Sequence, residues 1–169
     1  VAHAESLEDG VAVVVQREEK QLVVNGRLRG EDAAVEKGIA DALLHVTARD
    51  RAFVGGLGTG RALRALREFG RVTVGESDRV SAAVARRVFG DLPPNSTLAG
   101  AGFLETYDLI VLARETPRVE LYEQARSRLT ERGVLAQRLP LRYVAGSDLA
   151  AMLRTLHAVF PRIDLYVEE

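Results

Sequence analysis

The sequence has no cysteine among its 169 residues. This absence excludes a disulfide scaffold, a metal site built from thiolates and a cysteine nucleophile. The chain also has no apolar run of the ~18–20 residues needed to cross a bilayer. Residues 1–10 lack the basic start and the apolar stretch of a secretory signal peptide. We therefore expect a soluble, cytoplasmic protein that makes no contact with a membrane.

The sequence also lacks an excess of charge of either sign. The 23 Lys and Arg residues nearly balance the 24 Asp and Glu residues, which leaves a formal net charge of −1. A protein that binds nucleic acid usually presents a basic surface, and one that binds single strands adds aromatic side chains to it. The sequence shows neither pattern, so nucleic acid is not an expected partner.

The composition is sufficient for one hydrophobic core. Hydrophobic residues make up 47% of the chain and charged residues 28%, which is close to the average of globular proteins. A chain of 169 residues fits one compact unit, because domains usually hold ~100–200 residues. Within this unit we expect an N-terminal β-hairpin with a lead-in helix over 1–47 and an α/β part over 48–169.

Hydrophobic patterns along the chain predict a hairpin followed by alternating strands and helices. The hairpin strands are expected at 11–15 and 21–24, the second ending at the turn pair Asn25-Gly26, and a helix follows at 31–46. Further strands are expected at 51–54, 71–74, 97–98, 107–112, 133–139 and 163–167, and further helices at 61–69, 79–89, 119–129 and 148–160. We expect Ser147 to cap the last helix and Pro161 to end it. This alternation predicts an α/β fold with a doubly wound, mostly parallel sheet.

The turn after strand 51–54 carries the clearest functional signal. It contains Gly56, Gly58 and Gly60, and glycine lets the backbone turn tightly and approach a ligand closely. Glu76 follows at the end of the next strand, where a carboxylate can accept hydrogen bonds from ribose hydroxyls. Ligands of such sheets bind at the carboxyl ends of the strands. These residues indicate a nucleoside pocket; the alternative is a turn that only packs helix on strand, with Glu76 as a solvated loop acid.

The spacing of the glycines narrows the choice of ligand. They follow G-x-G-x-G and not the dinucleotide pattern G-x-G-x-x-G. A ligand without a pyrophosphate, such as S-adenosylmethionine, suits this spacing. We therefore expect a class I S-adenosylmethionine-methyltransferase-like (Rossmann-type) sheet with the N-terminal β-hairpin attached.

Several segments, in order and spacing, resemble the spermidine synthase (polyamine aminopropyltransferase) family, especially its shorter, divergent members. The segments are 23–28, 56–60, 72–78, 107–112, 133–137 and 153–161. The resemblance implies polyamine biosynthesis and a pocket for decarboxylated S-adenosylmethionine or methylthioadenosine, often in a homodimer. It also implies that Glu76 binds the ribose and that Gly56, Gly58 and Gly60 pass close to the nucleoside.

The sequence departs from the family where the chemistry is expected. In the family, an acid beyond the fourth strand helps to take the proton from the attacking amine, and that position falls on Ala113. A second acidic position falls on Thr116, and Arg114 adds a positive charge where a polyamine cation would bind. Glu115 is the remaining candidate for a catalytic base, and its alternative is a surface acid.

Other acidic positions of the family are changed as well. Thr59 stands where the family has an aspartate in the glycine-rich turn, and residues 99–101 lack the acid of a G-D-A segment. Glu36 keeps the acid of an upstream Y-H-E. Asp108 keeps its place, and we interpret it as a structural residue at a strand end.

No metal site is expected, because the three histidines lie far apart and lack partners at ligand spacing.

Three functions stay open. The first is a transferase with an S-adenosylmethionine-type donor. Aminopropyl transfer by this protein is doubtful, because Ala113 stands at the position of the family's catalytic acid. The second is a non-catalytic scaffold or regulatory partner with the same fold. The third is a methyltransferase for another acceptor, which needs donor positioning more than a dedicated base.

Overall fold

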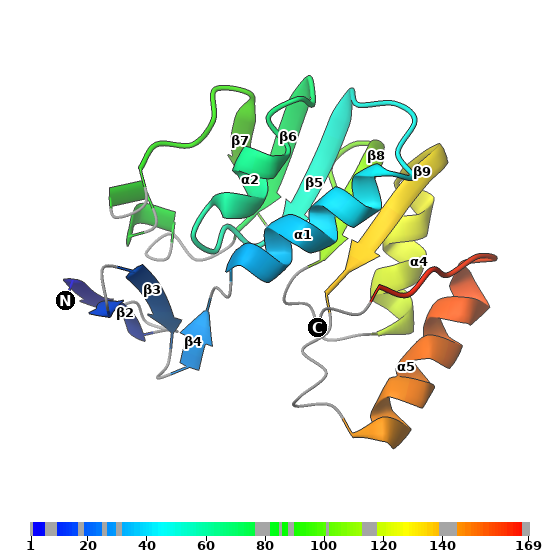
Figure 1. Cartoon of the computed structure of the whole chain (residues 1–169). Coiled ribbons are helices and arrows are strands. Elements are labelled where there is room, and N and C mark those ends of the chain that lie inside the picture. The colour runs from blue at the N-terminus through cyan, green and yellow to red at the C-terminus, as the bar shows by residue number, and fades with distance from the viewer. Residues whose placement is uncertain are drawn as a thin grey trace.

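The computed structural model describes residues 2–5, 10–16, 19–24, 27–29, 32–76, 82–84, 86–87, 90–100, 102–112, 118–138 and 145–166. These residues form two β-sheets, with helices packed against the larger one (Figure 1). The smaller sheet contains the N-terminal strands and lies to one side of the larger sheet (Figure 1).

The smaller sheet is antiparallel and has four strands in the order β1-β2-β3-β4. They are β1 (Ala2–Glu5), β2 (Gly10–Gln16), β3 (Glu19–Val24) and β4 (Arg27–Arg29). The predicted hairpin is confirmed as β2 and β3, which pair from Val11 opposite Val24 to Gln16 opposite Glu19. The sequence did not indicate β1 and β4, because both are short and lack a run of β-branched residues. The turn pair Asn25-Gly26 lies outside the described residues.

The larger sheet has five parallel strands in the order β7-β6-β5-β8-β9. They are β5 (Arg51–Gly55), β6 (Arg71–Gly75), β7 (Ser96–Ala99), β8 (Tyr107–Leu112) and β9 (Leu129–Gln137). The chain moves outward from β5 to β7 and then returns to the other side of β5 at β8. This reversal confirms the predicted α/β class and places the switch point of the sheet between β5 and β8.

Helices lie on both faces of this sheet (Figure 1). Helices α1 (Asp32–Leu43) and α2 (Arg61–Ala65) lie on one face, and α4 (Val119–Ser127) and α5 (Gly146–Val159) lie on the other. Of the helix expected at 79–89, the described residues 82–84 and 86–87 are helical. None of the described helices is both long and apolar enough to span a membrane.

Each buried strand supplies side chains to two cores, since successive residues of a strand point to opposite faces. Val54 of β5 and Leu109 of β8 pack with Leu63 of α2 on the first face. Phe53 and Ile110, their neighbours in sequence, pack with Tyr122, Ala125 and Leu156 on the second face. The near-continuous apolar runs of β5 and β8 therefore reflect burial on both sides, as is usual for parallel strands.

Two predicted element boundaries are wrong near β9, the last strand of the larger sheet. The helix expected at 119–129 ends at Ser127, and β9 begins at Leu129 instead of residue 133. The sequence pattern did not indicate the start of β9, because the strand pairs irregularly with β8 there. Tyr107 lies opposite Leu129, but Leu109 lies opposite Val134. A side chain on Gly133 would place its Cβ 2.9 Å from the Tyr107 carbonyl oxygen, so glycine is required at this irregularity.

The end of the chain also differs from the prediction. The N-cap of α5 is Ala145, so Ser147 lies inside the first turn and is not the cap. The strand expected at 163–167 does not form over 163–166. Ile163 packs against the second core, and the Tyr166 hydroxyl lies 2.5 Å from Nε2 of His45, which follows α1. Leu165 and Tyr166 are mostly exposed, so the apolar side chains of this segment are not buried as those of a sheet strand would be.

Tyr122 of α4 carries a buried hydroxyl that has no hydrogen-bond partner among the described residues. Burial raises the pKa of Tyr122 to about 12, because the apolar surroundings disfavour the charged phenolate. A buried hydroxyl without a partner also lowers stability.

We predict that Tyr122→Phe raises the free energy of unfolding at pH 7 by about 1 kcal/mol, because it removes this hydroxyl. In the unfolded chain the tyrosine ionises near pH ~10, so between pH ~10 and about 12 the unfolded state binds fewer protons and the wild type loses stability as pH rises. The variant should lack this part of the decline. Urea titrations of both proteins at pH 7, 10 and 11.5 measure the free energy of unfolding and its decline with pH. A variant that is less stable than wild type at pH 7 would contradict the prediction.

Candidate functional site

The glycine turn, residues 56–60, connects β5 to α2 in a conformation that requires glycine. The φ angles are +87° at Gly56, +57° at Gly58 and +78° at Gly60. Residues with a Cβ rarely adopt this left-handed region, whereas glycine enters it at little cost. All three glycines that the sequence singled out are therefore explained by the backbone of this turn.

Backbone and side-chain hydrogen bonds hold the turn against the end of β6. The Gly56 amide donates to the Gly75 carbonyl at 2.9 Å, and the Leu57 amide donates to Oε2 of Glu76 at 3.2 Å. The Glu76 amide in turn donates to the Ala99 carbonyl at the end of β7, at 3.2 Å. The carboxyl ends of β5, β6 and β7 are thus joined through residues of the predicted site.

Glu76 is partly buried, and its Oε2 accepts a hydrogen bond from the backbone of the turn. The Leu57 side chain is buried in the first core, which directs its amide, and not its side chain, toward Glu76. Arg61 at the start of α2 is exposed. The structure therefore brings together the predicted Gly56, Gly58, Gly60 and Glu76.

An aromatic cluster supports the strand end on which Glu76 lies. The ring centroid of Phe53 lies 4.7 Å from that of Phe103 and 5.5 Å from that of Tyr107. A Cβ on Gly75 would lie 2.5 Å from Cζ of Phe53, closer than any real contact. Gly75 is therefore required by the neighbouring ring and not by its own φ angle. No sequence motif indicates this packing, because Phe53 and Gly75 lie on different strands.

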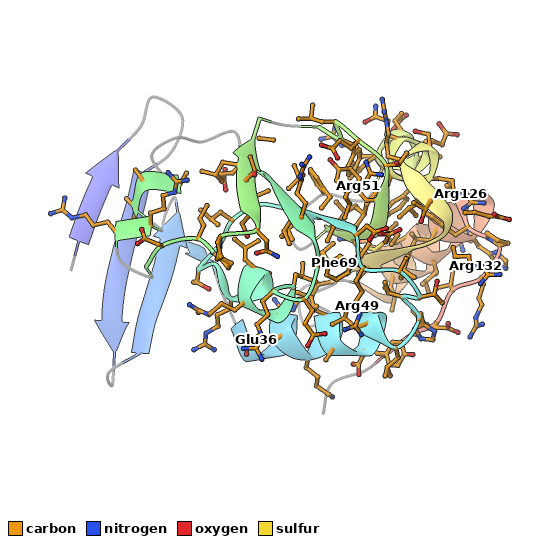
Figure 2. All side chains as sticks on the ribbon, turned by 90° about the horizontal axis from the view of Figure 1, so that it is seen from above. Glu36, Arg49, Arg51, Phe69, Arg126 and Arg132 are labelled. Carbon is orange, nitrogen blue, oxygen red and sulfur yellow. The ribbon has the colours of Figure 1, made fainter. Side chains whose placement is uncertain are left out.

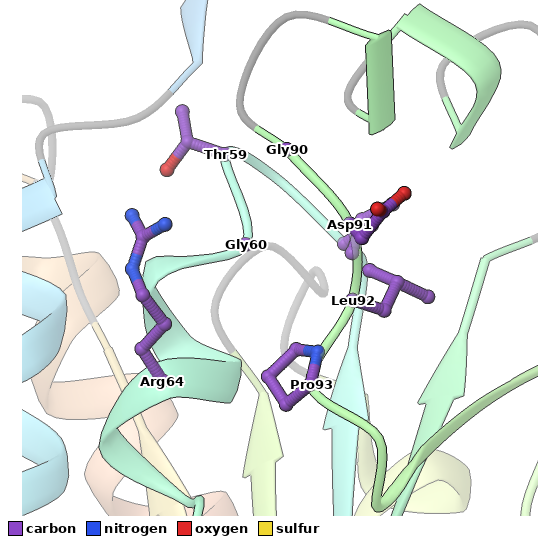
Figure 3. Close-up of a pocket in the computed structure, with 8 residues that line it drawn as sticks. Thr59, Gly60, Arg64, Gly90, Asp91, Leu92 and Pro93 are labelled. Carbon is purple, nitrogen blue, oxygen red and sulfur yellow. The ribbon is translucent and has the colours of Figure 1, made fainter.

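A small cavity lies beside the glycine turn (Figure 3). Its walls are Leu57, Thr59 and Gly60 of the turn, Arg64 of α2, and residues 90–93. The empty space is about 270 Å³, including the part open to solvent. No sequence motif marks Arg64 or residues 90–93, which come from a helix and a loop. The sequence therefore did not predict that they line a cavity.

The predicted catalytic positions fall at the end of β8, which stops at Leu112 opposite Gly55 of β5. Ala113, the expected site of the family's acid, and Glu115, the candidate base, lie outside the described residues and stay predictions. Glu36 lies on α1 and is partly buried (Figure 2), but it does not line the cavity.

Asp108 has a structural role at the opposite, amino end of the sheet, as the sequence predicts. Its Oδ2 accepts hydrogen bonds from the amides of Asp50 at 3.0 Å and Arg51 at 3.1 Å, and its Oδ1 accepts one from the Thr130 hydroxyl at 3.1 Å. This buried carboxylate joins the starts of β5 and β8 to β9. Among the described residues, no three His, Asp or Glu side chains gather as the ligands of a metal would.

Comparisons with known proteins give matches by structure only. No protein-family model and no curated protein matches the sequence. A spermidine synthase in complex with the transition-state analogue AdoDATO superposes with a TM-score of 0.84 at 17% identity, over 96% of this chain and 64% of that one. The spermidine synthase from Thermotoga maritima gives 0.82 at 17% identity, over 96% and 64%. An S-adenosylmethionine-dependent O-methyltransferase from Thermotoga maritima gives 0.63 at 19% identity, over 89% and 63%.

These matches show the fold. The chain has a class I S-adenosylmethionine-methyltransferase-like Rossmann fold, and its structural neighbours are spermidine synthases and S-adenosylmethionine-dependent methyltransferases. The chain spans less than two thirds of the length of the spermidine synthases that it matches.

We predict that Gly75→Ala destabilises the protein by about 1–3 kcal/mol, because the new methyl group overlaps the Phe53 ring. The double variant Gly75→Ala with Phe53→Leu should be less destabilised than the sum of the two single variants, since the smaller side chain makes room. Thermal unfolding of the four proteins of this double-mutant cycle measures the coupling. Additive effects would show that the ring does not require glycine.

We also predict that Asp108→Ala lowers the free energy of unfolding by about 2–4 kcal/mol, because two amides and a hydroxyl lose their common acceptor. Asp108→Asn should lose less than half as much, since its carbonyl oxygen still accepts from the amides and its NH₂ can donate to Thr130. Urea unfolding measures the loss of unfolding free energy in each of the two variants. Equal losses for the two variants would show that the charge, and not the hydrogen bonding, matters.

Proposed function

We propose that this chain binds the nucleoside part of an S-adenosylmethionine-type molecule at the carboxyl ends of β5 and β6. The observation that carries the proposal is the Glu76 carboxylate, held at the end of β6 beside a turn of three left-handed glycines. The fold supports it, because ligands of open α/β sheets bind at this edge.

The proposed contacts follow from the chemistry of the two groups. The 2′- and 3′-hydroxyls of ribose are donors, and a carboxylate can accept several hydrogen bonds at once. The hydrogen bond from Leu57 therefore orients Glu76 without preventing ribose binding. The glycine turn has no Cβ at Gly56, Gly58 or Gly60, so the nucleoside can lie against its backbone.

We propose S-adenosylmethionine, decarboxylated S-adenosylmethionine or methylthioadenosine as the bound molecule and group transfer as the reaction class. The structural neighbours include enzymes named as spermidine synthases and as a methyltransferase. Aminopropyl transfer is the less favoured reaction, because Ala113 cannot accept a proton from an attacking amine and Arg114 repels a polyamine cation. It would depend on Glu115 as a substitute base.

Methyl transfer to another acceptor is the second candidate function. The same change to Ala113 favours it, since methyl transfer depends on the position of donor and acceptor more than on a dedicated base. A non-catalytic protein that binds the nucleoside as a regulatory partner would have the same pocket. These alternatives share the donor site and differ only in whether a group is transferred after binding, and to which acceptor.

The experiment is a thermal-shift titration with methylthioadenosine, S-adenosylmethionine and decarboxylated S-adenosylmethionine. A ligand present at ~100 times its dissociation constant stabilises the folded state by about 2.7 kcal/mol, which shifts the melting temperature of a domain of this size by several degrees. We predict such a shift for wild type and its loss, with binding weakened about tenfold or more, in Glu76→Gln. The glutamine can still accept from the Leu57 amide, so the fold should be retained.

Glu131→Gln is the matched control, because this exposed acid lies on β9, away from the glycine turn. It should bind each nucleoside as wild type does. Equal affinity in wild type and Glu76→Gln would contradict the ribose-binding role of Glu76. The absence of any shift in wild type, with all three nucleosides at millimolar concentration, would contradict the proposed function.

A further inference from the structure

Residues 160–166, which we call the strap, follow α5 and connect the two faces of the larger sheet. Phe160 and Ile163 pack against the second core. Three residues later, Tyr166 contacts His45, which follows α1 on the face of the first core. In Figure 1 the strap, drawn in red, lies on the side of the larger sheet where β9 lies. The strap therefore passes from one core to the other around this side of the sheet.

Two side chains of the strap meet at His45. The Tyr166 hydroxyl lies 2.5 Å from Nε2 of His45, and the centroids of the two rings lie 6.0 Å apart. Oδ2 of Asp164 lies 3.9 Å from the same nitrogen. Leu165, between these two residues, is 65% exposed and adds little apolar contact. The polar contacts at this end of the strap thus depend on one histidine.

His45 is held in place by the core on which it lies. Its amide donates to the Ala42 carbonyl at 3.0 Å, and both Ala42 and the following Val46 are buried in the first core. Its own side chain is 33% exposed, so solvent protons reach the ring. His45 is therefore a fixed anchor that can exchange protons with the solvent.

The charge of this anchor decides how strongly it attracts the strap. Histidine is the side chain that ordinarily changes its charge between pH ~5 and ~8. The Tyr166 hydroxyl can donate to the neutral ring at Nε2, and it can accept from the protonated ring at the same atom. The Asp164 carboxylate gains a Coulomb attraction only when the ring is charged. Protonation of His45 therefore adds one favourable interaction and keeps the other.

Charged groups on the neighbouring elements do not reverse this sign. On α1, Asp41 lies one helical turn before His45 and also favours a positive ring, whereas Lys37 lies a further turn away. The elements that pack against α1 are α2 and β9, whose charged residues are Arg61, Arg64, Glu131 and Arg132. In the described structure, no hydrogen bond or ion pair joins any of these four to His45.

Two further arginines near the anchor are already paired. Arg49, in the loop after α1, pairs with Glu68, and Nε of Arg162 lies 3.0 Å from Oδ2 of Asp164. Arg162 thus shares the carboxylate that would attract a charged His45. The gain on protonation is accordingly small, in the range of an exposed ion pair.

We propose that the strap is a pH-sensitive latch, which His45 holds more firmly when its ring is protonated and releases more often when the ring is neutral. Release frees the end of the strap at Asp164 and Tyr166, on the β9 side of the sheet. The latch lies apart from the glycine turn and does not depend on the binding of a nucleoside.

The absence of cysteine from the chain makes the motion of the strap measurable. A nitroxide spin label on Leu165→Cys reports it, because Leu165 is exposed and lies between the two residues that contact His45. EPR spectra at pH 5.5 and pH 8 give the ratio of mobile to immobile label. We expect this ratio to be about threefold higher at pH 8. Equal ratios at the two pH values would overturn the proposal.

Two histidine variants in the labelled protein identify the group that titrates. His45→Gln should give the same ratio at both pH values, because glutamine does not ionise. His157→Gln is the matched control, since His157 is exposed on α5 and makes no hydrogen bond or ion pair with the strap in the described structure. It should keep the pH dependence. A dependence that survives in His45→Gln, or disappears in His157→Gln, would contradict the latch.

Two variants of the strap separate the charge from the hydrogen bond. Asp164→Asn should keep the label immobile through Tyr166 and lose the pH dependence, because the attraction to a charged ring is gone. Tyr166→Phe should raise the mobile fraction at both pH values and keep the dependence. An unchanged pH dependence in Asp164→Asn would show that the carboxylate does not sense His45 and would overturn the proposed mechanism.

Discussion

The hydrogen bond from the Leu57 amide to the Glu76 carboxylate connects the two strand ends on which the candidate site depends. It forms because the glycine turn follows left-handed φ angles that turn the amide of Leu57 toward β6 while its side chain enters the core. A second hydrogen bond, from Gly56 to Gly75, fixes the same turn against the same strand. The position of the carboxylate is thus a property of the turn and the sheet together, and a change in either would move it.

The two ends of the sheet use carboxylates for different purposes. At the amino end, the buried Asp108 accepts three hydrogen bonds from protein groups, which joins the strand starts and gives it a structural role. At the carboxyl end, Glu76 is partly buried and accepts a hydrogen bond from the Leu57 amide, and we propose that it also binds ribose. Between them, two apolar cores on opposite faces hold the strands in place. The packed sheet provides the rigid frame that a preorganised binding site needs.

Much of the fold could be predicted from the sequence because the buried parallel strands are short apolar runs separated by helical patterns. The elements that escaped prediction have weaker signals: β4 has three residues, and the start of β9 is polar and irregularly paired. The strand predicted at 163–167 does not form over 163–166, because Ile163 packs against the second core while Leu165 and Tyr166 stay exposed, so alternating apolar residues alone did not bring the segment to the sheet.

The candidate site was only partly predictable, for a physical reason. Gly56, Gly58, Gly60 and Glu76 follow a local pattern of turn and strand end, which a sequence shows. The contact between Phe53 and Gly75 joins residues of neighbouring strands, and the cavity at Arg64 joins a helix to a distant loop. Such contacts depend on the sheet order, which the sequence did not specify strand by strand.

The central claim is that the Glu76 carboxylate, oriented by the glycine turn, binds the ribose of an S-adenosylmethionine-type nucleoside. A crystal structure of the protein with methylthioadenosine tests it most directly. We predict both ribose hydroxyls within hydrogen-bond distance of Glu76, about 2.5–3.0 Å, with the nucleoside against the backbone of residues 56–60. A nucleoside bound elsewhere, with Glu76 making no contact to ribose, would contradict the claim.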